Sequence, residues 1–168
     1  MTPGLPFSSA RSTKVLRIAA TSPTALTTAK LMMWVKLESP GVMPVMLSHG
    51  QWNQDGYFLQ TFNGGLRFDL EGVGTLDAGH IEPGRWYHIA ATYDGIVMKI
   101  YLNGREVGSK PASGMPKPCS RNLYIGRYEL PGDEYETDCQ VAAVRIYTIG
   151  LTSQEVAAEY NRLAGRLR

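Results

Sequence analysis

The feature that most constrains the fold is a short segment bounded by two glycine turns, YDGIVMKIYLNG at residues 93–104. Asp-Gly and Asn-Gly pairs favour the tight turns that join antiparallel strands, because glycine readily adopts the positive φ that such turns need. The intervening run is long enough for one strand and too short for a stable helix. A two-residue turn at Asp94-Gly95 predicts three pairs on the apolar face of a hairpin: Ala91 with Met98, Ile89 with Ile100, and Tyr87 with Leu102.

The opposite face of this hairpin is more polar. Its predicted pairs are Thr92 with Val97, Ala90 with Lys99, and His88 with Tyr101. An apolar face backed by a polar one is typical of a half-buried antiparallel sheet. On the polar face we expect His88 to have a structural, hydrogen-bonding role rather than a catalytic one.

The same turn signals recur along the chain. Asn63-Gly64 predicts a second hairpin, and Asn103-Gly104 and Asp55-Gly56 are further candidate turns. In the second hairpin Leu59 opposes Phe68, Tyr57 opposes Leu70, and Gln60 opposes Arg67 on the outer face. Further strands are predicted at residues 14–19, 31–37, 45–48, 122–126 and 141–147. Many short strands at close spacing indicate an all-β sandwich or barrel.

One short helix is predicted near the end of the chain. Thr152 and Glu155 have the spacing of a capping box, in which each side chain bonds the other residue's backbone N–H. Val156, Tyr160 and Leu163 then recur at helical spacing. We expect this apolar side of the helix to pack on the sandwich.

Length and charge limit the possible classes of protein. The 168 residues suit a single domain, 1–168, in which the Pro-, Gly- and Ser-rich residues 1–12 are expected to form a flexible arm. Lys and Arg number 17 against 15 Asp and Glu, without a basic stripe, so no nucleic-acid partner is expected. No signal peptide and no long apolar run is present, so no membrane insertion is expected. Cys119 and Cys139 fit either one disulfide or two thiols.

Several motifs together resemble a known family. They are GRWYHIAATYDG at 84–95, MKIYLNG at 98–104, LYIG at 123–126, VRIY at 144–147 and LTSQEV at 151–156. They are similar to successive signatures of the laminin G-like group in the concanavalin A-like lectin and glucanase superfamily, over about residues 14–163. The resemblance implies an antiparallel two-sheet jelly-roll β-sandwich.

The resemblance also implies a function. Members of the family commonly act as non-catalytic modules that bind carbohydrate or mediate adhesion, attached to secreted or surface proteins, so an extracellular or surface setting and a glycan partner are expected. The alternative is a structural module that binds other protein modules in a larger surface assembly. A glycoside hydrolase is disfavoured, because the paired carboxylates of the glucanase pattern, Glu-x-Asp-x-Glu or Glu-x-Asp-x-x-Glu, do not occur in the chain.

Many relatives hold a structural calcium ion, for which an aspartate in the closing strand is a frequent ligand. The matching position here is Ala142, whose methyl group cannot ligate a cation. We therefore expect no cofactor. A different metal site would have to use the acidic loop residues Asp133, Glu134, Glu136 and Asp138, for which a solvated loop is the alternative reading.

The segment HGQWNQD at residues 49–55 has the composition of a sugar site. Trp52 can stack on the apolar side of a pyranose ring, and Gln51, Asn53 and Asp55 can bond its hydroxyl groups. Two tyrosines would complete a cleft if a second loop meets this one: Tyr128 and Tyr135. Trp52 is less suited to the core than Trp34 or Trp86, because its neighbours are polar or glycine. Alternatively, Trp52 folds over the edge of the sandwich as a lid on the core.

Overall fold

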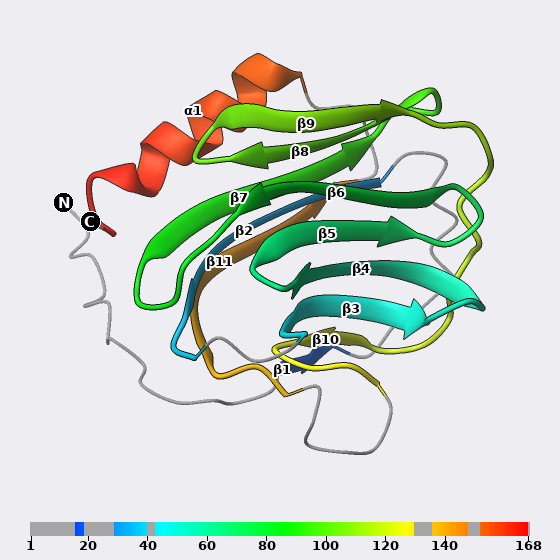
Figure 1. The fold of residues 1–168 in the computed structure, drawn as a ribbon, viewed down its shortest axis with the longest axis horizontal. Coiled ribbons are helices and arrows are strands. Elements are labelled where there is room, and N and C mark those ends of the chain that lie inside the picture. Colours follow the sequence, from blue (N-terminus) through cyan, green and yellow to red (C-terminus); the bar gives the residue numbers. More distant parts are fainter. Residues whose placement is uncertain (1–15, 19–28, 40–42, 130–135, 148–151, 168) are drawn as a thin grey trace, which may run out of the picture.

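The computed structural model describes residues 16–18, 29–39, 43–129, 136–147 and 152–167. Strands and one helix alternate with tight turns over these ranges (Figure 1). The strands are β1 (Leu16–Ile18), β2 (Ala29–Leu37), β3 (Val45–Gln51), β4 (Asp55–Phe62), β5 (Gly65–Leu70), β6 (Gly74–His80), β7 (Trp86–Tyr93), β8 (Val97–Leu102), β9 (Arg105–Pro111), β10 (Leu123–Ile125) and β11 (Cys139–Tyr147), and the helix is α1 (Ser153–Ala164). The predicted arm at residues 1–12 lies outside the described residues.

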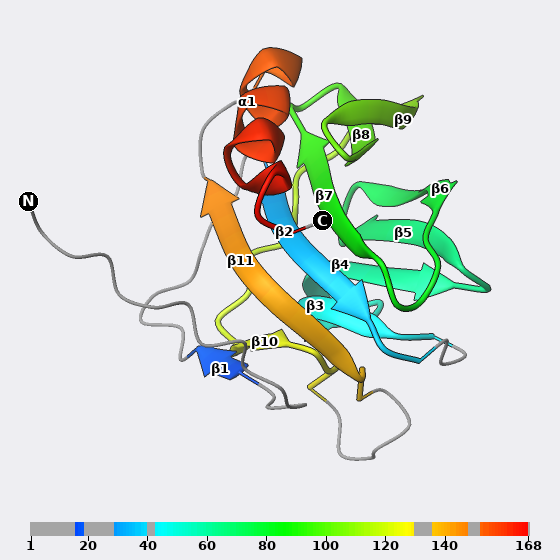
Figure 2. The same ribbon diagram turned by 90° about the vertical axis from the view of Figure 1, so that its left-hand side faces the viewer.

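The strands form two antiparallel sheets. The six-stranded sheet has the order β1-β10-β3-β4-β5-β6, and the five-stranded sheet has the order β11-β2-β7-β8-β9. Figure 2 shows the two sheets as separate layers, with α1 against the outer face of the five-stranded sheet. The predicted all-β, two-sheet jelly roll with a short C-terminal helix is confirmed.

The main core lies between the two sheets and follows the alternation of each strand. Ile89, Ala91 and Ile100 of the five-stranded sheet are fully buried there, opposite residues such as Leu59 and Phe68 of the six-stranded sheet. The apolar face predicted for the 93–104 hairpin is therefore confirmed as the core face. Burial of such side chains supplies most of the free energy that drives folding.

The register predicted for this hairpin is wrong by two residues. Ile89 pairs with Leu102 and Ala91 with Ile100, so the connection between the strands is longer than the predicted two-residue turn. The Asp94 carboxylate explains the difference. It accepts hydrogen bonds from the backbone N–H groups of Ile96 and Val97, at 3.0 and 2.9 Å, and so holds a longer loop. A shift of two residues keeps every side chain on its predicted face.

Three other predicted turns can be compared with the structure. Asn63-Gly64 forms the predicted two-residue turn with φ values of 50° and 80°, and all three predicted β4–β5 pairs are confirmed. Asn103-Gly104 joins β8 to β9 in the same way. The turn predicted at Asp55-Gly56 is wrong, because both residues begin β4 and the chain reverses just before them, over residues 52–54.

The strands predicted from apolar runs correspond to β1, β2, β3, β10 and β11. Two strands were not predicted, β6 with the sequence GTLDAGH and β9 with REVGSKP. Their glycines and charged residues have low intrinsic strand preference, and pairing with β5 and β8 holds them in place. Each exposes many side chains, so neither has a continuous apolar pattern.

Helix α1 covers the outer face of the five-stranded sheet. Val156 is fully buried against Met32, Ala90 and Tyr101, which form a second small core. Tyr160 stacks on Trp34 with ring centroids 5.6 Å apart, which agrees with the predicted packing side of the helix. The face of β7 predicted to be polar is therefore covered rather than solvated.

His88 lies in this covered layer and is only 2% exposed. Its ring lies 5.5 Å from the ring of Trp34 and 6.0 Å from that of Tyr160. Its Nδ1 atom has no hydrogen-bond partner among the described residues, whereas its backbone N–H donates to Asn103 Oδ1 at 3.0 Å. The observed contacts of the His88 ring are thus packing contacts with aromatic rings.

The capping box predicts a measurable contribution to stability. The Thr152 N–H donates to Glu155 Oε2 at 2.6 Å, and the Glu155 N–H donates to Thr152 Oγ1 at 3.3 Å. We expect Thr152→Ala to lower the free energy of unfolding by about 1 kcal/mol, the usual cost of losing an N-cap side chain. Urea unfolding followed by tryptophan fluorescence measures this change. Thr152→Ser keeps the hydroxyl and should lose much less; equal losses would contradict the capping role.

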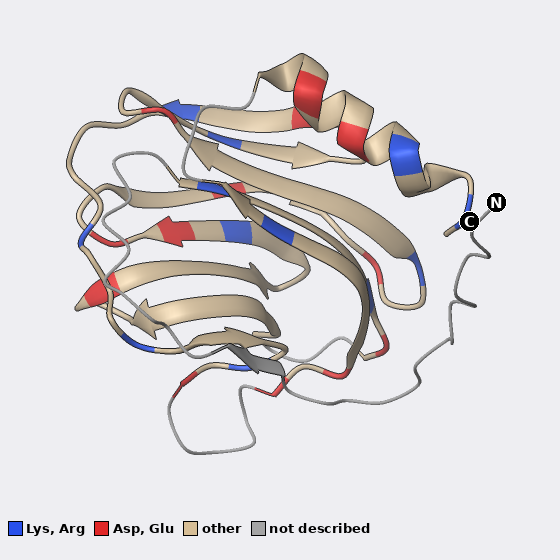
Figure 3. Cartoon of the chain, turned by 180° about the vertical axis from the view of Figure 1, so that it is seen from behind, with Lys and Arg blue, Asp and Glu red and all other residues tan. Residues whose placement is uncertain are grey.

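Charges of both signs are distributed over the strands and α1. Figure 3 shows Lys and Arg interspersed with Asp and Glu over this view of the molecule. Several form ion pairs, among them Lys99 with Glu106 at 2.9 Å and Arg145 with Glu159 at 3.2 Å. No helix in the described part of the chain has the length and apolar character needed to cross a membrane.

Candidate ligand-binding site

A cavity of about 420 Å³ opens on the outer face of the six-stranded sheet. Alternation along β4 separates this face from the main core: Tyr57 and Leu59 point between the sheets, whereas Phe58 and Gln60 line the cavity. Phe58 belongs to a separate buried cluster with Val45 of β3 and Tyr128. The cavity floor is therefore made by strands that are fixed from behind by the main core.

The cavity combines an apolar part with a few polar groups. The apolar and aromatic lining residues are Met43, Val45, Trp52, Phe58 and Tyr128, and the polar ones are Gln51, Gln60 and Arg67. A mostly apolar cavity with a small number of polar groups is the usual composition of a small-molecule site. Its volume lies within the usual range for such sites.

Trp52 is presented by the turn between β3 and β4. The Gln54 N–H donates to the Gln51 carbonyl oxygen at 2.9 Å and closes the turn. Asn53 takes a φ of 60°, a conformation that asparagine tolerates better than most residues. The Gln51 N–H donates to Asp55 Oδ1 at 2.9 Å. The turn is thus stabilised by its own residues.

Contacts to neighbouring segments hold this turn against the sheet. The Trp52 N–H donates to the Tyr128 hydroxyl, and the Asn53 N–H donates to Glu71 Oε1 at 2.8 Å. Arg121 Nε bonds Asp55 Oδ2 at 3.3 Å. These bonds connect the turn with the β5–β6 connection and with the residues on both sides of β10.

The aromatic side chains form a row across the cavity. The Trp52 and Phe58 ring centroids are 6.3 Å apart, and those of Phe58 and Tyr128 are 5.4 Å apart. Phe58 is 1% exposed and Tyr128 is 8% exposed, whereas Trp52 is 42% exposed. Trp34 is only 5% exposed, so Trp52 is less buried than Trp34, as the sequence predicted. The indole of Trp52 is thus the most accessible ring of the row.

The polar side of the cavity is organised by two carboxylates. Gln60 Nε2 donates to Asp69 Oδ2 at 3.1 Å, and the Thr75 hydroxyl donates to Asp69 Oδ1. Burial raises the pKa of Asp69 to about 6. Arg67 donates from Nε and Nη2 to the two oxygens of Asp77 at 2.7 and 2.8 Å, and these bonds lower the pKa of Asp77.

The structure brings together three of the six residues predicted for ligand binding. Gln51, Trp52 and Tyr128 line the cavity. Asn53 and Asp55 do not line it, because they form the turn and its anchoring bonds. Tyr135 lies outside the described residues.

Sequence reasoning missed Gln60 and Arg67 as cavity residues. The pattern did contain a signal, since this pair was predicted to face outward from the Asn63-Gly64 hairpin and does so. Gln60 and Arg67 share a cavity with Trp52 because the β3–β4 turn lies over this face of the sheet. The position of that turn cannot be predicted from residue spacing along the chain.

The position that holds a frequent calcium ligand in the family is occupied here by alanine. Ala142 in β11 supplies no oxygen ligand from its side chain. Of the acidic loop residues, Asp133 and Glu134 lie outside the described residues, and Glu136 forms an ion pair with Arg127 at 3.3 Å. Within the described ranges, no group of three His, Cys, Asp or Glu side chains is placed to hold a metal ion.

Both cysteines are free thiols in the structure. Cys119 is buried, and Cys139 at the start of β11 is partly buried. Burial raises the pKa of the Cys139 thiol to about 11 and also raises that of Cys119. Both side chains are therefore protonated at neutral pH and weakly nucleophilic.

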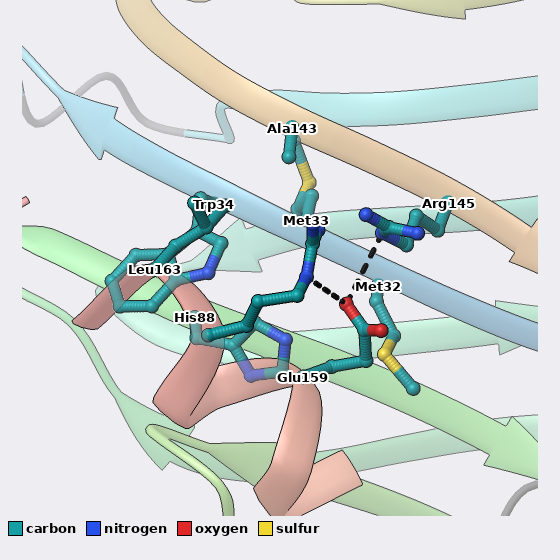
Figure 4. Close-up of a pocket in the computed structure, with 9 residues that line it drawn as sticks. Met32, Met33, Trp34, His88, Ala143, Arg145, Glu159 and Leu163 are labelled. Carbon is teal, nitrogen blue, oxygen red and sulfur yellow. Dashed lines mark hydrogen bonds and ion pairs between the residues drawn. The ribbon is translucent and has the colours of Figure 1, made fainter. Parts of the chain in front are cut away.

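A much smaller hollow of about 10 Å³ lies between α1 and the five-stranded sheet. Figure 4 shows His88 and Trp34 beneath the helix, with Glu159 reaching toward Arg145. Glu159 Oε2 lies 3.2 Å from Arg145 Nε and 3.2 Å from Arg162 Nε, so these charges pair with one another. The hollow has room for about one water molecule and is not a site for a larger ligand.

Comparison with known proteins gives one match among curated sequences and many among solved structures. The chain is 41% identical to mouse pappalysin-1 over 71 residues, which is 40% of this chain and 4% of pappalysin-1. A SAP-like pentraxin from Limulus polyphemus superposes with a TM-score of 0.68 at 17% identity, covering 85% of this chain and 73% of the pentraxin. A Bacteroides ovatus protein, provisionally described as carbohydrate-binding, also gives a TM-score of 0.68 at 17% identity, covering 84% of this chain and 43% of that protein.

These structural matches have low identity and establish the fold alone. The family is established by sequence, since residues 13–157 match the family model Laminin_G_3, which is described as concanavalin A-like lectin/glucanases superfamily. The match includes the strands of both sheets and the beginning of α1. The chain therefore belongs to the laminin G-like group of the concanavalin A-like lectin/glucanases superfamily.

Proposed function

We propose that the protein is a non-catalytic module that binds a glycan in the cavity on the outer face of the six-stranded sheet. The observation that carries the proposal is the exposed indole of Trp52 next to three polar side chains, Gln51, Gln60 and Arg67, across a cavity with an aromatic floor. Sugars are recognised by aromatic stacking against their C–H faces and by hydrogen bonds to their hydroxyl groups. The cavity offers both kinds of contact.

The same cavity is poorly suited to glycoside hydrolysis. Hydrolysis usually needs two carboxyl groups on either side of the scissile bond. None of the described residues that line the cavity carries a carboxyl group. Asp69 and Asp77 lie on the neighbouring strands and are engaged by Gln60 and Arg67. Binding without turnover is therefore the activity that the geometry supports best.

The test is binding to a glycan array, followed by calorimetric titration of the best-bound glycan. We expect Trp52→Ala to weaken binding at least about tenfold, because it removes the most accessible stacking surface of the cavity. Since more than half of the Trp52 residue is buried, the substitution should also lower the free energy of unfolding by about 1 to 3 kcal/mol, so affinities are compared where both proteins are folded.

The matched control is Ile96→Ala. Ile96 is 71% exposed and lies between β7 and β8 of the five-stranded sheet, away from the cavity lining, so its loss should leave glycan affinity unchanged. Equal affinity of the Trp52→Ala protein and the wild type would reject this cavity as the site. Absence of glycan binding, together with a defined oligomer in solution, would favour a protein-interaction module instead.

A further inference from the structure

The polar side of the cavity has a definite hydrogen-bonding pattern. The Asp69 carboxylate accepts a bond from the amide nitrogen of Gln60 at 3.1 Å, which fixes the orientation of that amide, because its oxygen would be repelled by the carboxylate. Asp69 is 2% exposed, and Thr75 holds its other oxygen. The group of Gln60 that can bond a ligand is therefore its side-chain carbonyl oxygen, which is a hydrogen-bond acceptor.

The neighbouring Arg67 supplies donors, and its charge is already neutralised. Gln60 and Arg67 are directly opposite each other in the β4–β5 register. Arg67 makes two bonds to Asp77, at 2.7 and 2.8 Å, and its guanidinium lies 4.9 Å from the centre of the Phe62 ring. A ligand carboxylate would have to compete with Asp77 for this cation.

The charges around the cavity offer no net attraction for an anion. Arg67 is the one charged side chain among the described lining residues, and two carboxylates, Asp69 and Asp77, act on it electrostatically. Neutral pH lies above the Asp69 pKa of about 6, so this carboxyl group is ionised, and both of its oxygens accept hydrogen bonds. Lys110 also acts on Asp77 and donates to the Thr75 carbonyl oxygen at 3.2 Å, so two cations face two carboxylates and no net positive charge remains to attract an anion.

We infer that the cavity takes an uncharged sugar and discriminates against uronic, sialic and sulfated sugars, an inference that rests on the proposed glycan-binding function. A sugar hydroxyl can accept a bond from Arg67 and donate one to the Gln60 carbonyl oxygen, whereas a carboxylate or sulfate has only acceptors and is repelled by that oxygen. Asp77 is a positioning residue, because it occupies the guanidinium of Arg67 without lining the cavity.

The experiment compares glycans that differ only in charge. The probes are tetrasaccharides of glucose, galactose or mannose and the corresponding tetrasaccharides of their uronic acids, titrated at pH 7.5. We expect the neutral member of the best-bound pair to bind at least about tenfold more tightly than its acidic counterpart.

A substitution at Asp77 should change this selectivity. In Asp77→Asn the Arg67 charge is no longer neutralised, and we expect the ratio of neutral to acidic affinity to fall at least about fivefold. The matched control is Glu106→Gln, which removes the same charge from the Lys99–Glu106 ion pair on the five-stranded sheet. This variant should keep the wild-type ratio.

The outcomes separate the inference from the proposed function. Tighter binding of the acidic member by the wild type, weakened by Trp52→Ala, would overturn the inference and support the glycan site. An unchanged ratio of neutral to acidic affinity in Asp77→Asn would also overturn the inference, because the selectivity would then not depend on neutralisation of the Arg67 charge by Asp77. If no tetrasaccharide and no arrayed glycan binds, the proposed function fails and the inference fails with it.

Discussion

Gly56→Ala should be among the most destabilising single substitutions in the protein, with a loss of about 4 kcal/mol in the free energy of unfolding or failure to fold. Gly56 has a φ of 84° and lies opposite Gly50 in the β3–β4 pair. A Cβ at Gly56 would overlap the backbone carbonyl oxygen of His49, which cannot move without breaking the pairing. The cost combines a left-handed conformation for alanine with a clash against backbone.

Gly84→Ala is a matched control for this substitution. Gly84 has nearly the same φ, 80°, but a Cβ there would meet nothing within 4 Å. The control should therefore show only the conformational cost, about 1 to 2 kcal/mol. Urea unfolding followed by tryptophan fluorescence compares the two variants. A Gly56→Ala loss within about 1 kcal/mol of the Gly84→Ala loss would show that the hairpin can open to accept the methyl group.

If Gly56→Ala does not fold, a second variant keeps the explanation testable. A Cβ at Gly50 would overlap the Asp55 carbonyl oxygen on the other side of the same contact. Gly50→Ala should therefore fail in the same way, whereas Gly84→Ala should fold. Both glycines support the turn that presents Trp52, so the close approach of β3 and β4 links the fold to the candidate site.

The parts of the fold that could be predicted from the sequence are those set by local signals. Asn63-Gly64 specifies its own turn geometry, and the alternation on either side then determines which side chains face the core. The Asp94 loop was predicted in the wrong register because a side chain, rather than the glycine alone, determines its length. Strands β6 and β9 were missed because their stability comes from neighbouring strands.

The candidate site was predictable only in part for a related reason. Gln51 and Trp52 are adjacent in sequence, so one polar and aromatic turn suggested both. Arg67 and Asp77 meet across β5 and β6, and no pattern indicated β6 as a strand. The burial of Asp69 beside Gln60 likewise depends on the assembled sheet. Long-range pairing thus decides the charge and hydrogen-bond pattern of the cavity.

The wild type should lose about 3 kcal/mol of stability relative to a His88→Gln variant as the pH falls from 6.5 to 4. Burial lowers the pKa of His88 from 6.5 to about 4, since the ring is 2% exposed. The unfolded chain therefore binds a proton over this window that the folded protein does not, and stability falls with pH. The magnitude follows from the size of the pKa shift.

The surroundings of His88 explain why its charged form is disfavoured. Trp34 and Tyr160 cover the ring from the sheet and from α1. Glu159, the carboxylate that lines the same hollow, is paired with Arg145 and Arg162 at 3.2 Å each, so it is not available to stabilise an imidazolium. Protonation would place an uncompensated charge beneath the helix.

The effect must be measured as a difference between proteins, because Asp69 acts in the opposite sense. Its pKa is raised from 3.8 to about 6, so the folded state binds the extra proton over this range and gains stability as the pH falls. The two contributions nearly cancel in the wild type. Urea unfolding at pH 7, 5.5 and 4.5 should therefore show His88→Gln gaining stability relative to the wild type as the pH falls. Asp69→Asn, which removes the opposing contribution, should lose stability with acid, and parallel curves for all three proteins would contradict the assignment of a lowered pKa to His88.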